Sequence, residues 1–482
     1  MSFSLQAATE RGLGTYGKAA AAISITACTM VAFSFPVPVL FALVGAVALF
    51  AGVLSPGWVL VLYTFSVVFE YVPLLSELKV AVPTAIGAFF LAGTFGHMAL
   101  TRDMLRLRSR VPSLLTLTLI VFVAAAIEKP AWTFSNPRGL VTFAALWATA
   151  WASGQLLVHP KRPWYIVWAL ALGATLVSLM AIYESVTGHY NQFRLFSGYD
   201  ERAFGLSDPN YAAATLVTLL PFLVALFVAF RSVLIKLVAA SAVGLSIVAV
   251  AMTASRGGLL GGLVTIPATL LWVPISRKRV SMTGNVNGMT VTSRGTPWAR
   301  LGATAVLLCA LGLGVVLAPH TLWERAGATL EKSSVFDKEA RVDIWTTYLE
   351  KWGESPWWGY GPGYLDPATA DQRLPIPHNT EIELLTEVGF IGACAFFLLN
   401  GMAWWEALKA RKLLAEQGQI RLSILSGAVA ASLVGFHTTA LFLTRARTKE
   451  LWLFFGLVAA LHHMAKSGDH AAPVRLSNPE MA

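Results

Sequence analysis

The chain has 482 residues, of which 56% are hydrophobic and only 13% are charged. Soluble proteins average about 25% charged residues, so this composition excludes a soluble globular protein and indicates that lipid is the solvent. The net charge of +10 would otherwise suggest a nucleic-acid partner, but its basic residues lie in short loops between apolar runs. The positive-inside rule accounts for that pattern, so we expect membrane lipid and no nucleic acid as a partner.

The apolar runs predict an all-α, polytopic transmembrane bundle, because a span needs roughly 20 apolar residues. They cover residues 19–35, 37–54, 57–74, 80–100, 112–127, 139–158, 164–183, 209–230, 232–254, 257–273, 300–319, 383–405, 421–443 and 449–465. The first three runs are short and are crowded by Pro36, Pro38 and Pro56. They form two spans, a re-entrant hairpin or three spans, which gives about 12 to 14 helices.

Clusters of Lys and Arg fix the orientation. They lie at 102–110, 161–162, 231–236, 277–300 and 411–421. With fourteen spans and a cytoplasmic N-terminus, all five clusters are cytoplasmic, and so are both termini. Residues 184–208, 255–256, 320–380 and 444–449 then face outward, while 276–299 is a flexible cytoplasmic linker. We expect helices over 1–319, a long, partly helical periplasmic loop over 320–380, further helices over 381–465 and a cytoplasmic tail over 466–482.

The apolar runs carry few ionisable groups. Their central parts contain no Asp or Glu, and the histidines within the runs lie toward run ends, namely His97, His437, His462 and His463. Ion-coupled transporters keep charges at mid-membrane, and many have internal repeats, which this sequence lacks. We therefore expect the chemistry on the outer face.

The first outer motif is segment 201–210, which reads ERAFGLSDPN. Asp208 followed by Pro209 is typical of a helix start, because Asp accepts from the first amides and Pro suits the first helical position. A helix cap does not explain Arg202, which precedes a span on the side where Arg is disfavoured.

The second motif, TASRGG at 253–258, joins two apolar spans. Arg256 needs a partner there, and Gly257 and Gly258 would let a bulky ligand approach the backbone. The alternative for Arg256 is snorkelling to lipid headgroups.

The long outer loop contains an amphipathic segment at 338–352, with apolar residues at helical spacing. We expect this helix to lie at the membrane interface, with its aromatic side chains packed on the bundle. Arg341 on the same helix is a further candidate anion contact. The following stretch WWGYGPG, which includes Tyr360, is fit for lining a groove.

The third motif, PHNTEIE at 377–383, predicts a helix that starts about Glu381, with Thr380 and Glu383 as a capping box. His378 lies just ahead of that positive helix end, which disfavours imidazolium. A neutral imidazole is what a general base requires. The alternative is a purely structural histidine.

The outer segments thus offer arginines, which suit phosphate oxygens, and one candidate base. They contain no clustered metal ligands and no glycine-rich phosphate loop. The cysteines Cys28, Cys309 and Cys394 form no CxxC motif and are expected to pack in apolar stretches. We expect neither a metal nor a cofactor, and a lipid phosphate or diphosphate as substrate.

These motifs together resemble the O-antigen ligase and O-antigen polymerase family of bacterial envelope glycosyltransferases. The resemblance rests on RAFGLSDPN, TASRGG, ARVDIW followed by WWGYGPG, and PHNTEIELLTEVGFIG, over roughly 201–392. It implies a helical bundle in the bacterial inner membrane, whose periplasmic loop holds a half-helix.

The resemblance also implies an activity in polysaccharide assembly, including lipopolysaccharide biosynthesis. A glycan would leave undecaprenyl diphosphate for an acceptor, by a metal-independent, inverting reaction at the periplasmic face. His378 would be the catalytic base, and Arg202 and Arg256 would bind the diphosphate, with Arg341 and Tyr360 as further substrate contacts. We expect a ligase that uses lipid A–core. A polymerase that extends another lipid-linked glycan, a protein O-oligosaccharyltransferase and a non-catalytic polysaccharide transporter are the alternatives.

Overall fold

A computed structural model describes residues 53–69, 82–101, 105–129, 137–188, 208–273, 279–281, 292–294, 297–316, 338–364 and 376–468. The chain divides into two compact units, Met1–Arg106 and Leu107–Ala482. In the first unit α3 (Pro56–Val67) packs on α4 (Val82–Thr101), and Tyr63 stacks on Phe90 with 5.6 Å between ring centroids. The expected runs at 19–35 and 37–54 lie outside the described residues.

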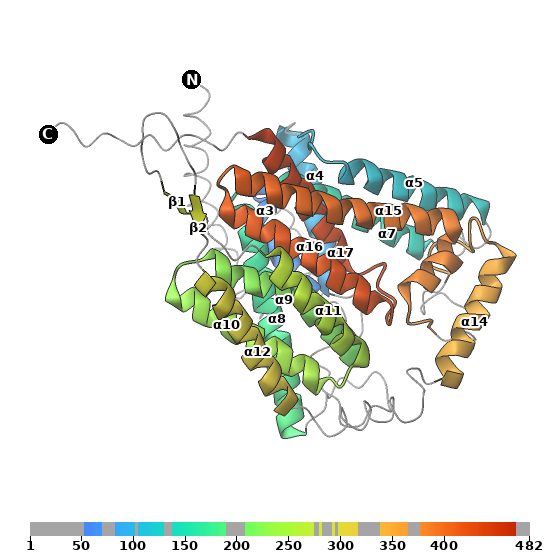
Figure 1. Cartoon of the computed structure of the whole chain (residues 1–482). Coiled ribbons are helices and arrows are strands. Elements are labelled where there is room, and N and C mark those ends of the chain that lie inside the picture. The colour runs from blue at the N-terminus through green and yellow to red at the C-terminus, as the bar shows by residue number, and fades with distance from the viewer. Residues whose placement is uncertain are drawn as a thin grey trace, which may run out of the picture. The chain divides into compact units, whose positions relative to one another are not determined.

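The second unit is helical, as Figure 1 shows. Its helices are α5 (Val111–Glu128), α7 (Arg138–Leu156), α8 (Arg162–Thr187), α9 (Pro209–Ala229), α10 (Val233–Met252), α11 (Arg256–Trp272), α12 (Pro297–Val316), α14 (Lys338–Glu354), α15 (Thr380–Glu416), α16 (Ile420–Ala440) and α17 (Lys449–Ser467). Within the described ranges, seven helices are long and apolar enough to cross a membrane. The chain is therefore an all-α, multi-pass membrane protein, as its hydropathy predicts.

Two details differ from the sequence prediction. The helix expected over 57–74 is shorter, because α3 ends at Val67. The linker expected at 276–299 contains a short hairpin, in which β1 (Arg279–Ser281) pairs antiparallel with β2 (Thr292–Arg294).

Helices α9 and α16 form the centre of the second unit. The apolar windows of these helices are 83% and 78% buried, against 33% for α5 at the periphery. Small residues allow the close contacts, as is common between membrane helices. A Cβ added to Gly261 of α11 would lie 2.4 Å from Cγ2 of Thr439 on α16. Tight packing therefore fixes the ends of these helices, where the outer motifs lie.

Helix α15 is broken near its start. Gly389 has φ 66° and ψ −173°, a conformation open essentially to glycine, and it separates a half-helix (380–388) from the long remainder. The helix thus extends beyond the expected 383–405 at both ends.

The stretch WWGYGPG, together with Pro356 just before it, closes this break by hydrogen bonding to the freed backbone groups. The four bonds join Tyr360 N to Thr386 O (2.9 Å), Gly361 N to Glu387 O (2.8 Å), Phe390 N to Pro356 O (2.8 Å) and Ile391 N to Trp357 O (3.3 Å). Broken helices in membranes need such internal partners, because lipid offers none. The observed role of this stretch is to support the half-helix.

Candidate functional site

His378 directly precedes the cap of the half-helix. Asn379 is the N-cap residue, and its side chain accepts from Ile382 N at 2.9 Å. The predicted position of His378 ahead of a helix N-terminus is therefore confirmed. The predicted capping box is wrong: the Thr380 hydroxyl donates to Leu443 O (2.7 Å) and accepts from Arg445 N (2.9 Å). The segment after α16 thus recruits the residue that local sequence rules assigned to the cap.

The backbone of His378 is strained and held on both sides. Its φ is 48°, a left-handed value that costs a non-glycine residue about 1–3 kcal/mol. On one side, the Trp345 indole of α14 donates to Pro377 O at 2.8 Å. On the other, the Asn379 amide donates to Leu441 O at 3.1 Å. These contacts fix the direction in which the imidazole leaves the backbone.

Arg256 lies at another helix start, on the other side of the cap: it follows the N-cap residue, whereas His378 precedes one. It is the first residue of α11, whose N-cap Ser255 accepts from Gly258 N at 3.2 Å. Ala254, just before the cap, has φ 49°. Ala254 and His378 are the non-glycine residues with positive φ in the described part of the chain, and both precede a cap by one residue. At both helix starts the strained residue directly precedes the N-cap, and a candidate site residue lies next to that cap.

The glycines next to Arg256 serve packing, which corrects the expectation that they admit a ligand. A Cβ added to Gly258 would lie 2.5 Å from Cβ of Ala213 on α9. A Cβ added to Gly257 would lie 3.0 Å from Cβ of Phe442. Both glycines bring the start of α11 against neighbouring protein.

The start of α9 follows the prediction for its cap. Asp208 accepts from Asn210 N (2.9 Å) and Tyr211 N (3.4 Å). The Asn210 side chain in turn accepts from the Ser255 hydroxyl at 3.0 Å, which ties the start of α9 to the start of α11. Arg202, expected just before this helix, lies outside the described residues.

Residues 441–448, the loop between α16 and α17, connect these helix starts. Thr444 O accepts from the Tyr211 hydroxyl of α9 (3.0 Å), and Leu441 O accepts from Asn379 at α15. Phe442 packs on Gly257 of α11. Three positive helix ends therefore share one loop, and helix N-termini favour anions.

The 441–448 loop carries two arginines that sequence reasoning missed. The Arg445 side chain is 1% exposed and forms a buried ion pair with Glu450, and it donates to the Thr439 hydroxyl at 2.6 Å. Arg447 bonds to Glu383 (2.8 Å) and Glu387 (2.5 Å) of the half-helix. The sequence did contain a signal for Arg445 and Arg447, because arginine is disfavoured in a segment predicted to face outward. The same argument singled out Arg256.

The Arg447 cluster joins three segments through one carboxylate. Besides its contact with Arg447, Glu387 accepts from Gly363 N at 3.1 Å. Gly363 lies in the stretch that closes the break in α15, and Glu387 is fully buried. The half-helix is therefore held by charge at its side as well as by hydrogen bonds at both ends.

Helix α14 packs differently from the expected apolar stripe. Tyr348 is its buried residue and contacts Ile382 of the half-helix, while Val342 and Leu349 are exposed. Burial, with the nearby Tyr364 and Glu387, raises the pKa of Tyr348 to about 12, so its phenol stays protonated. Arg341 lies on α14, but its side chain is outside the described set.

Tyr360 lies in an aromatic and charged cluster. Its ring stacks on Tyr364 with 4.8 Å between centroids, and Lys351 lies 5.0 Å from the Tyr360 centroid. Its hydroxyl donates to the Glu354 carboxylate. Burial and this hydrogen bond raise the pKa of Tyr360. Among the described residues, no three His, Cys, Asp or Glu side chains cluster to hold a metal ion.

Comparison with known families supports the resemblance. Residues 241–397 match the model of a family described as O-antigen ligase. The matched stretch includes Arg256, Arg341, Tyr360 and His378, whereas Arg447 follows it. No curated protein matches the chain. The second unit of this chain therefore contains a domain of the O-antigen ligase family, a family of glycan-transferring enzymes.

Proposed function

We propose that this protein transfers a glycan from undecaprenyl diphosphate to an acceptor at the periplasmic face of the bacterial inner membrane. The leading acceptor is lipid A–core, which makes the protein an O-antigen ligase. His378 is the general base, and Arg202 and Arg256 bind the diphosphate. Arg341 and Tyr360 are further candidate substrate contacts.

The observation that carries this proposal is the held, strained backbone at His378. A left-handed residue fixed by Trp345 and by Asn379 is typical of functional sites, because such strain persists only where surrounding contacts over-determine it. The start of α11, which bears Arg256, shares the 441–448 loop with the start of α15. The shared loop supports a site that combines a base with anion-binding helix ends.

The chemistry follows from these groups. The acceptor hydroxyl attacks the anomeric carbon from the face opposite the diphosphate, and the bond between that carbon and the diphosphate oxygen breaks. His378 takes the hydroxyl proton, which contributes about 10²–10⁴-fold to the rate. The arginines and the positive helix ends stabilise the charge that grows on the leaving diphosphate. Because this leaving group already departs readily, the reaction needs neither a metal nor a covalent intermediate.

The alternatives differ in acceptor. An O-antigen polymerase uses another lipid-linked glycan, and a protein O-oligosaccharyltransferase uses Ser or Thr. A non-catalytic transporter would move the same substrate without breaking a bond. Deleting the gene separates them: long glycans stranded on undecaprenyl diphosphate indicate a ligase, and surface core with a single repeat indicates a polymerase. Unchanged glycans with unglycosylated protein indicate a protein transferase.

Complementing the deletion strain with His378→Ala tests the base. We expect transfer to fall by at least about 10²-fold while the protein still inserts, because the Asn379 cap remains. His378→Asn is the matched control for the backbone, since Asn tolerates left-handed φ and is no base. It should be as inactive as His378→Ala. Wild-type transfer in either variant would rule out His378 as the base.

A further inference from the structure

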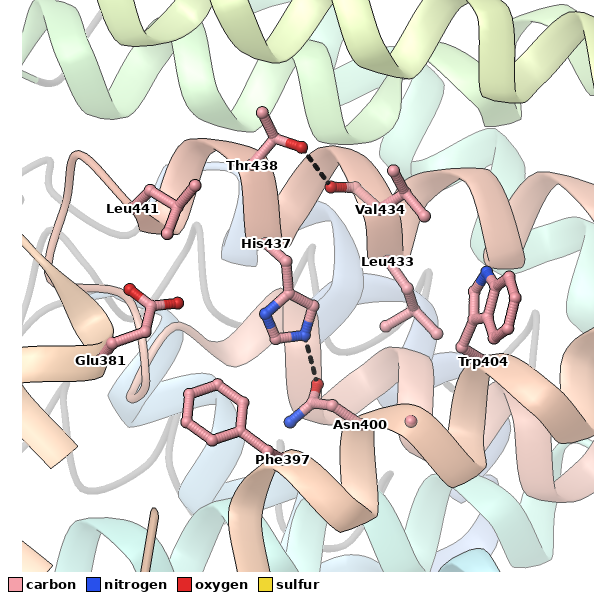
Figure 2. A pocket seen from close by; sticks show the side chains of 10 residues that line it. Glu381, Phe397, Asn400, Trp404, Leu433, Val434, His437, Thr438 and Leu441 are labelled. Carbon is pink, nitrogen blue, oxygen red and sulfur yellow. Dashed lines mark hydrogen bonds between the residues drawn. The ribbon is translucent and has the colours of Figure 1, made fainter. Parts of the chain in front are cut away.

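A groove of about 420 Å³ lies between α15 and α16, with Glu381 and Leu441 at one end and Trp404 toward the other (Figure 2). It extends about 12 Å along α16 from Leu433 to Leu441, at 1.5 Å per residue. Most of its lining is apolar, which suits a lipid chain and not a free sugar.

The polar atoms near the Glu381 end act as hydrogen-bond acceptors. The Asn400 amide donates to Phe396 O at 2.8 Å, so its oxygen accepts from Nε2 of His437 at 2.9 Å. In the neutral ring Nδ1 then carries no proton and is an acceptor. Figure 2 shows this nitrogen on the side of the ring that faces Glu381. Oε2 of Glu381 is buried and has no hydrogen-bond partner within the described part of the chain.

These acceptor atoms determine which chemical groups on a lipid head can bind at this end of the groove. A carboxylate and an imidazole acceptor match a head that carries O–H or N–H donors. A diphosphate carries acceptors and no donors, so it cannot pair with the acceptor atoms of Glu381 and His437. No Lys or Arg occurs among the described residues that line the groove. The indole N–H of Trp404, a donor, lies toward the far end, against Trp272.

We propose that the groove between α15 and α16 binds an apolar chain of the acceptor glycolipid, with donor groups of its head at Glu381 and His437. This assignment rests on the proposed function and names the class of its second substrate. It favours an acceptor lipid whose apolar chain is not linked to its sugars through a diphosphate.

The groove ends at Glu381 and Leu441, close in the chain to the residues that hold His378. Leu441 lines the groove, and its carbonyl oxygen accepts from Asn379, the residue after His378. The next residue along the loop, Phe442, packs against Gly257, beside Arg256. The acceptor groove and the diphosphate-binding helix starts therefore flank one loop, with the base at its edge.

Gly401 gives a direct test, because it lines the groove and a Cβ added to it meets no atom within 4 Å. Gly401→Leu adds a side chain at the groove, and its Cβ displaces no protein atom. Gly244→Leu is the matched control: Gly244 lies in α10, and its Cβ also meets nothing within 4 Å. Both variants exchange a helical glycine for leucine, and only Gly401 lines the groove.

Transfer is measured with the full chain in nanodiscs, at varied lipid A–core and varied undecaprenyl-diphosphate glycan. We expect Gly401→Leu to raise the KM for lipid A–core by about tenfold, which corresponds to 1.4 kcal/mol of lost binding. The KM for the donor, and for a core oligosaccharide without its lipid, should stay within about twofold of wild type, as in Gly244→Leu. Glu381→Gln should raise the KM for lipid A–core by about fivefold, because the amide replaces one acceptor oxygen with a donor, which cannot pair with a donor of the lipid head.

Two outcomes would overturn the assignment. An increase in the donor KM alone would place the prenyl chain of the donor in the groove. Unchanged KM values for both lipids would leave the groove to bulk phospholipid. Native mass spectrometry of the purified protein with lipid A–core needs no transfer and separates the two proposals. Retention of this lipid by wild type and its loss in Gly401→Leu support the groove even where transfer fails, and equal retention contradicts it.

Discussion

The two ends of α15 both bury glutamates, but they use them differently. At the His378 end, Glu383 and Glu387 bind the side chain of Arg447. At the other end, Glu406 accepts from the Ser109 hydroxyl (2.6 Å) and from Arg110 N (2.9 Å), just ahead of α5. At the His378 end, the partner of the buried glutamates is a cationic side chain. At the other end, the partners of the buried glutamate are a hydroxyl and a backbone amide at the start of a helix.

The backbone differs in the same way. The His378 end contains a left-handed residue, a half-helix and a break at Gly389, whereas the remainder of α15 has regular helical geometry up to Glu416. Strained conformations need extra contacts, which Arg447, Trp345 and the WWGYGPG stretch supply. The comparison indicates that this end is built for precise positioning and the other for joining helices.

The largest effect is expected for Gly389→Ala. A Cβ there would lie 2.3 Å from the backbone of Trp357, and φ 66° with ψ −173° excludes other residues. We expect a loss of about 4 kcal/mol or more in stability, together with transfer activity. Thermal unfolding in detergent measures the change. Gly401→Ala on the same helix is the control and should unfold like wild type, since its Cβ meets nothing within 4 Å.

Arg447→Met should have the next largest effect on stability, because it leaves Glu383 and Glu387 buried beside each other without their cation. Breaking such a pair costs about 3–5 kcal/mol. Combining it with Glu383→Gln and Glu387→Gln removes both charges and should recover more than half of the lost stability. If the triple variant has a lower melting temperature than Arg447→Met, the unpaired charges are not the reason for the loss of stability.

Glu406→Ala at the other end should have a smaller effect, of about 1–3 kcal/mol, because it leaves the Ser109 hydroxyl and Arg110 N without their acceptor. The KM values for both substrates should not change, since this end lies away from His378 along α15. A changed KM with unchanged stability would contradict the division between the two ends.

Asn379→Ala tests the cap of the half-helix and should cost about 0.5–2 kcal/mol. It also removes the bond to Leu441 O that holds His378. We therefore expect kcat to fall more than this stability loss alone would explain. Asn379→Asp keeps the cap and loses the donor to Leu441 O, so it should recover the part of the stability that the cap contributes and still show the lower kcat.

Local patterns predict much of this protein. Helices form at every apolar run that the structure describes from 80–100 onward, with ends within a few residues, except that α15 exceeds its run. The cap at Asp208 and the helix at α14 also follow the sequence, although α14 buries Tyr348 and exposes part of the predicted apolar stripe. These features depend on periodicity and on residues next to one another, which a sequence displays directly.

The failures share a physical reason. Thr380 and Glu383 have the spacing of a capping box, but Leu443 and Arg447 bind them, more than sixty residues away in the chain. Partners that distant are decided by helix packing, which no local pattern contains. The same holds for the glycines at 257–258, which face Phe442 and Ala213.

By itself, the sequence determined that the chain is a multi-pass helical membrane protein, because lipid is the solvent that suits its composition. It also singled out His378 and Arg256, whose residue types stand out beside helix starts. Only the tertiary structure decided which segments meet. The 441–448 loop links the starts of three helices, and the groove opens between α15 and α16. Both depend on how closely small residues let helices approach, a property of facing surfaces and not of either surface alone.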